Sequence, residues 1–88
     1  MERAPHPLDQ LLAAELDHAR DLLIMMGDEL AMSPEIVAEH GMALQAVDIV
    51  GQMLGHIANV IRSSDPEGAV ELIGMAELKA RLQRRSIG

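Results

Sequence analysis

The sequence predicts an all-α chain in which a long antiparallel helical hairpin is followed by a shorter third helix. Two helix starts predict this division: Ser33-Pro34-Glu35 and Asp65-Pro66-Glu67 each offer a capping side chain, a proline for the first helical position and an acid for the first turn. No stretch alternates with period two, as a strand would. We therefore expect helices at about 8–32, 34–63 and 66–85.

The first helix carries one apolar stripe at helical spacing, formed by Leu8, Leu12, Leu16, Ala19, Leu23, Met26 and Leu30. A stripe of this width, ~100°, is enough to contact one neighbouring helix. Only a residue or two separates this helix from the next, and so short a connection makes two helices antiparallel neighbours.

The second helix has an apolar arc of roughly 240° on the helical wheel, far wider than one neighbour requires. It should therefore be the central helix, contacted from several sides. At about 1.5 Å per residue it would be ~45 Å long, whereas a compact chain of this size has a radius of gyration near ~12 Å. We expect an elongated bundle that is completed by further copies of the chain, with a dimer as the first expectation.

The third helix shows two apolar stripes on opposite sides. One contains Leu72, Ile73 and Ala76 and would close the chain's own bundle, while the other would face a partner. Together with the second helix, this outer stripe predicts an interface formed by Val50, Met53, Ile57, Val60, Met75, Leu78 and Leu82.

Composition limits the class of protein. With 88 residues the chain is one domain, expected at 8–85 between a leader at 1–7 and a tail at 86–88. A net charge of -7 and the absence of aromatic residues argue against nucleic-acid binding. The apolar runs are too short for a bilayer span, so we expect a cytoplasmic protein that does not bind membranes.

One fragment has the residues of a metal site. Glu15 and His18 form a Glu-x-x-His pair of the kind found in carboxylate di-metal bundles, and His40 is the nearest further ligand. If the hairpin turns at Ser33, however, His40 lies level with Met26, ~12 Å along the axis from this pair. We therefore predict no metal and no cofactor, and retain Glu15, His18 and His40 only as weak candidates.

His40 falls inside the apolar arc of the second helix, which predicts a buried neutral imidazole with a structural role. Helical phosphotransfer domains are similar in size, but the Lys-Gly that follows their histidine is missing after His18, His40 and His56. The basic residues at the end of the third helix should interact with its C-terminus and with the acidic first helix; they are Lys79, Arg81, Arg84 and Arg85.

Two glycines, Gly51 and Gly55, have the small-x-x-x-small spacing that lets helices approach closely. No nucleophile, base and orienting acid fall in a recognisable pattern, so we do not expect an enzyme. The sequence predicts a non-enzymatic module for protein interaction or assembly, with a protein partner in addition to further copies of the chain. The alternative is a signalling or metal-binding bundle that uses His40, His18 and Glu15.

Overall fold

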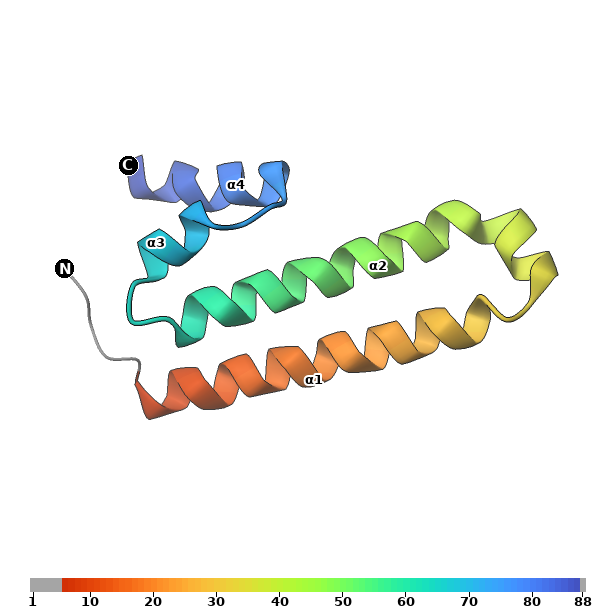
Figure 1. The fold of residues 1–88 in the computed structure, drawn as a ribbon, viewed down its shortest axis with the longest axis horizontal. Coiled ribbons are helices and arrows are strands. Elements are labelled where there is room, and N and C mark those ends of the chain that lie inside the picture. Colours follow the sequence, from red (N-terminus) through yellow and green to blue (C-terminus); the bar gives the residue numbers. More distant parts are fainter. Residues whose placement is uncertain (1–5, 88) are drawn as a thin grey trace.

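The computed structural model describes residues 6–87, with side chains for residues 6–83, and contains four helices and no strand in that range. They are α1 (Pro7–Leu30), α2 (Pro34–Arg62), α3 (Pro66–Glu71) and α4 (Ala76–Ile87). The predicted all-α hairpin is confirmed, since α1 and α2 run antiparallel along each other and the shorter helices follow (Figure 1). Of the predicted leader and tail, residues 1–5 and 88 lie outside the described residues; α1 and α4 include Pro7 and Ile87.

The starts of α1, α2 and α3 are each fixed by a side chain that accepts a backbone hydrogen bond, as the sequence predicts for two of them. Ser33 Oγ accepts from the amide of Ile36, and a carboxylate oxygen of Asp65 accepts from Gly68. At α1 the cap is His6, whose Nδ1 accepts from the Leu8 amide at 3.0 Å. His6 is therefore a helix cap, a role that its place in a proline-flanked leader did not indicate.

The prediction of one continuous third helix is wrong, because the chain breaks between α3 and α4 around Gly74. Glycine is about 1 kcal/mol less favourable than alanine inside a helix, which makes this the weakest point of the predicted span. Across the break, Glu71 accepts a hydrogen bond from Gln83 at 2.8 Å and pairs with Lys79 at 3.9 Å. These two contacts hold α3 and α4 together as a short second hairpin.

The second helix is also interrupted, at His40, whose φ of -128° and ψ of 29° are not helical. The residues before this kink therefore belong to the turn of the hairpin, and the antiparallel pairing of α1 with α2 begins beyond it (Figure 1). This changes the register of the hairpin. A turn at Ser33 predicts that Gly51 lies opposite Glu15, but Gly51 lies against Arg20 and Ile24. The expected burial of His40 is likewise wrong, since its side chain is exposed.

The molecule is elongated and thin, with principal extents of 51 × 27 × 17 Å and a radius of gyration of 15.5 Å. A compact chain of this length would have a radius near ~12 Å. An α-helix with its side chains is about 10–12 Å across, so the short dimension has room for little more than one layer of helices. In that layer α2 is central, as predicted, with α1 on one side and α3 on the other.

So thin a layer encloses very little. Among residues 6–83, the large side chains that are buried are Ile73 and Leu78, and the other buried apolar residues are Ala13 and Ala58. Helical domains normally bury their apolar stripes against a second layer. Here many large apolar side chains of α1 and α2 remain exposed.

Candidate protein-interaction surface

In the contact between α1 and α2, two glycines, one on each helix, face the opposite helix. A Cβ placed on Gly27 would lie 3.3 Å from Cγ1 of Val47, and one on Gly51 would lie 3.8 Å from side-chain atoms of both Arg20 and Ile24. Both glycines are buried. They therefore mark the line along which each helix faces the other.

At Gly51 and Gly55, where the sequence predicts a close approach of helices, the nearest atoms of α1 belong to side chains. A Cβ on Gly55 would lie 3.4 Å from Nη1 and 3.5 Å from Cδ of Arg20. Because the two glycines lack side chains, the stem of Arg20 lies across α2. Beside it is a hollow of about 260 Å³ lined by Arg20, Ile24, Asp48, Gly51 and Gln52.

Asp17 of α1 pairs with Arg20 within the same helix and with Arg62 of α2, and the pair with Arg62 joins the two helices. Arg62 forms a salt bridge with Asp17, and its guanidinium also donates to the backbone oxygens of Ala13 and Ala58. The hydrogen bond from Arg62 lowers the pKa of Asp17 below its ordinary value of 3.8; burial opposes this effect, and the charges of Arg62 and Arg20 add to it. Asp17 is therefore ionised near neutral pH and holds the helices together on one side of the hairpin.

The two sides of the hairpin differ in character. Each residue of a helix advances about 100°, so the neighbours of an inward-facing glycine project to opposite sides of the hairpin. Because α1 and α2 are antiparallel, the residue that precedes such a glycine projects to the same side on both helices. Met26 precedes Gly27 and Val50 precedes Gly51, whereas Asp28 and Gln52 follow them.

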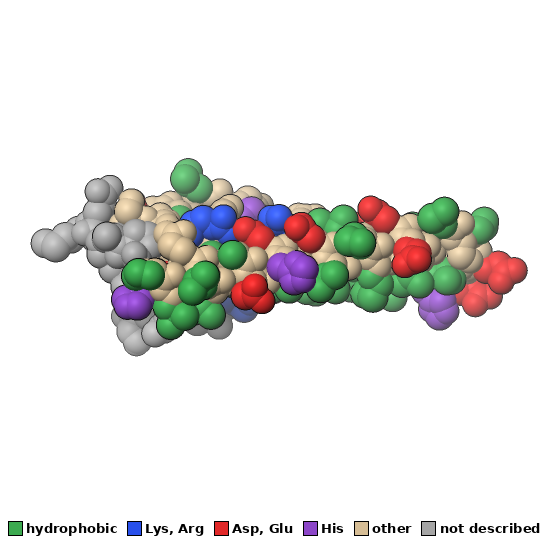
Figure 2. All heavy atoms as spheres, turned by 90° about the horizontal axis from the view of Figure 1, so that it is seen from below, with side chains coloured by type: hydrophobic (Ala, Val, Ile, Leu, Met, Phe, Trp, Pro, Cys, Tyr) green, Lys and Arg blue, Asp and Glu red, His purple; other side chains and the backbone are tan. Residues whose placement is uncertain are grey.

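One side is therefore mostly apolar, with Glu15 at its outer margin, and we call it the apolar face. On α1 it is formed by the stripe predicted from the sequence, and on α2 by residues of the broad arc: Leu8, Leu12, Leu16, Ala19, Leu23, Met26, Leu30, Ala43, Val47, Val50, Leu54 and Ile61. Seen past α1, hydrophobic side chains gather along one long edge, and most of the basic and many acidic groups lie toward the other (Figure 2).

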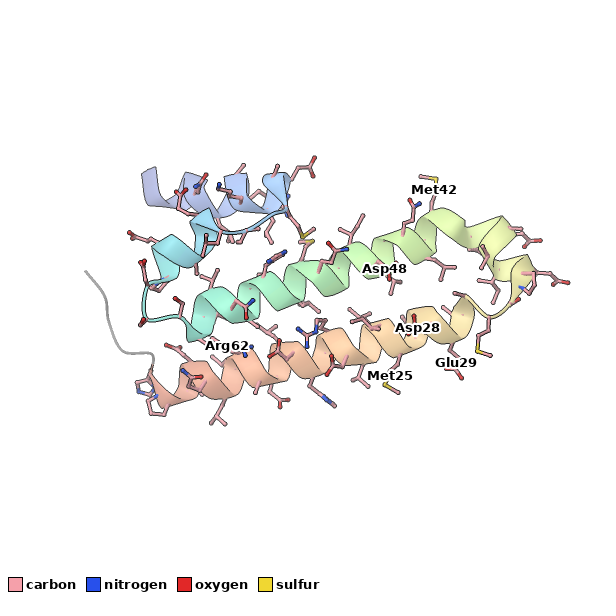
Figure 3. All side chains as sticks on the ribbon, viewed as in Figure 1. Met25, Asp28, Glu29, Met42, Asp48 and Arg62 are labelled. Carbon is pink, nitrogen blue, oxygen red and sulfur yellow. The ribbon has the colours of Figure 1, made fainter. Side chains whose placement is uncertain are left out.

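The opposite side, the polar face, carries the ion pairs. Asp17, Asp28 and Asp48 lie on it, together with Arg20, Arg62 and Gln52. Figure 3 shows Asp28 and Asp48 in projection between α1 and α2, while Met25 and Met42 project from the two outer edges of the hairpin. The acids are thus largely kept off the apolar face.

The structure distributes the residues of the predicted interface over two environments. Val50 is exposed on the apolar face. Met53, Ile57 and Val60 are partly covered and belong to the half of α2 along which α3 and α4 lie (Figure 1). The prediction that Leu78 faces away from the chain's own core is wrong: Leu78 is 4% exposed and buried together with Ile73, while Met75 and Leu82 are partly covered.

Leu78 is buried because the chain breaks at Gly74. Side chains after the break no longer follow the helical periodicity of the residues before it. Leu72, which a continuous helix would turn inward beside Ile73, is instead 86% exposed. The sequence predicts the stripe of α1 that forms half of the apolar face, but it predicts this stripe as a contact with α2 alone. To predict that such a stripe is half exposed, one must know which of its residues face α2.

The weak metal candidates do not come together. Glu15 and His18 are exposed on α1, whereas His40 lies at the kink of α2 beside Glu39. Among the described residues, no three acidic or histidine side chains are grouped so that they could hold a metal ion. Lys79 of the basic cluster pairs with Glu71 rather than with α1, and the side chains of Arg84 and Arg85 lie outside the described residues.

Comparison with known proteins adds no functional information. No family model, curated protein or solved structure matches the chain. Within residues 6–87, none of the helices has both the length and the apolar character needed to cross a bilayer. The features that bear on function are therefore the two faces of the hairpin.

Proposed function

We propose that this protein is a non-enzymatic interaction and assembly module, which self-associates and binds a protein partner by packing helices against helices. The single observation that supports this is the thin helical layer with an uncovered apolar face. A helix or hairpin is stable when its apolar side is covered, and a second helical layer supplies that cover.

The exposed area supports the same proposal. The chain exposes 6533 Å², whereas a folded monomer of its mass is expected to expose about 5,000 Å². The excess of about 1,500 Å² exceeds the ~800 Å² that each partner contributes to a standard protein interface. Exposed apolar patches of several hundred Å² are typical of interaction sites.

Sedimentation velocity of the full chain over a range of concentrations tests this proposal. We expect a species larger than 9.5 kDa at micromolar concentration. Cross-linking in the native host followed by mass spectrometry then identifies which chains lie against this one. A monomer that melts cooperatively and cross-links to no chain would contradict the proposal.

A further inference from the structure

We infer that the apolar face is the interface of a homodimer, in which two hairpins pack face to face and both polar faces point outward. This inference rests on the proposed function and names the occupant of the surface: a second copy of this chain. The result is a four-helix core made from α1 and α2 of each copy. The arms formed by α3 and α4 lie beside that core.

The width and length of the face favour another hairpin over a single helix. The apolar face spans two parallel rows of side chains, one from each helix, along a molecule 51 Å long. A single partner helix would cover the inner part of the two rows and leave their outer flanks exposed. A second hairpin of the same length covers both rows, and a twofold axis makes each row meet an identical surface.

The charge distribution removes the main objection to self-association. With a net charge of -7, two copies repel each other unless their acids are kept apart. Asp17, Asp28 and Asp48 lie on the polar face, and Glu29 projects toward the outer edge of α1 (Figure 3). Face-to-face packing therefore brings apolar rows together and leaves these carboxylates in water.

The residues that precede Gly27 and Gly51 allow a variant of the apolar face to be matched with a control. Met26 and Val50 lie on the apolar face and are 45% and 43% exposed. Their chain neighbours Met25 and Ile49 are 65% and 48% exposed, but project toward the outer edges. The double variant Met26→Glu with Val50→Glu and the control Met25→Glu with Ile49→Glu each remove one methionine and one β-branched aliphatic residue, and add the same charge.

Light scattering of the three full-length proteins is the test, with circular dichroism as the measure of folding. We expect the wild type and the control variant to have twice the mass of one chain, and the Met26→Glu, Val50→Glu variant to have half that of the wild type. A face variant that stays dimeric would overturn this interface but not the proposed function. A wild-type protein that is a folded monomer would overturn the homodimer, and also the self-association in the proposed function.

A milder pair covers the case in which the charged variant does not fold. The chain has no cysteine, so Val50→Cys and Ile49→Cys each introduce a single thiol. Their similar exposure in one chain predicts similar reaction rates with a maleimide in a monomer. In the dimer, the thiol at position 50 should lose its reactivity and regain it on dilution, while the thiol at position 49 reacts throughout. Equal rates at high concentration would overturn the inference.

Discussion

Gly27 on α1 faces Val47 on α2 so closely that a Cβ on the glycine would lie 3.3 Å from Cγ1 of the valine. This contact sets the register of the hairpin and thereby decides that Met26 and Val50 share one face. Gly41 provides the comparison, since a Cβ there would meet nothing within 4 Å.

We therefore expect Gly27→Val to destabilise the protein by about 1–3 kcal/mol relative to Gly41→Val, because overpacking forces the helices apart. Urea unfolding of both variants measures the difference. Equal free energies of unfolding would show that the helices separate at Gly27 without cost.

Acid should remove the contribution of Asp17 to stability. Arg62 lowers the pKa of this carboxylate, so the stabilisation is complete above the ordinary value of 3.8 and is lost as the pH falls through the lower folded value. Asp17→Asn should lower the melting temperature at pH 7, and the difference from wild type should shrink below pH 3.8.

Asp28→Asn is the control for Asp17→Asn, because it removes a carboxylate from the same face of α1. Less self-repulsion in an acidic chain should leave its melting temperature unchanged or slightly higher. If both variants fall equally, general charge rather than the Arg62 contact accounts for the loss.

Glu71 should control how firmly α4 is held against α3. Glu71→Ala removes the hydrogen bond from Gln83 and the pairing with Lys79, whereas Glu71→Gln keeps an acceptor for Gln83. We expect faster amide exchange in α4 for the alanine variant and an intermediate rate for glutamine, with global stability changed by less than about 1 kcal/mol. Unchanged exchange in both variants would mean that Ile73 and Leu78 alone hold the arm.

His40 should tolerate replacement, because its side chain is exposed at the kink rather than buried in the arc of α2. We expect His40→Leu to alter the free energy of unfolding by no more than about 0.5 kcal/mol, as for most surface substitutions. Guanidinium unfolding provides the measurement. A loss of several kcal/mol would indicate that this end of the hairpin is covered in the assembly.

The sequence was sufficient for what local chemistry determines. Ser33 and Asp65 cap helices that begin at Pro34 and Pro66, as predicted, and the wide arc of the second helix correctly made it central. The sequence was insufficient where a helix is interrupted, because the directions of side chains beyond the interruption cannot be extrapolated from those before it. The kink at His40 shifted the pairing of α1 with α2, and the break at Gly74 exchanged the environments of Leu72 and Leu78.

Only half of the apolar face could be predicted from the sequence, for a related reason. The stripe from Leu8 to Leu30 was recognised, but helical periodicity does not say how much of a stripe one neighbour covers. The contact line through Gly27 and Gly51 shows that α2 meets this stripe from one side. The remainder, with Val50 beside Met26, forms the apolar face.

If two copies pack through the apolar face as proposed, the thinness of the helical layer makes folding of this chain obey mass action. Among the described residues, Ile73 and Leu78 are the only large side chains buried by the chain itself, so most of the favourable burial would come from a bimolecular step. The melting temperature should then rise with protein concentration. In the cell, the fraction of folded chains would depend on how many copies are synthesised, so that low abundance alone would expose the helices to proteases.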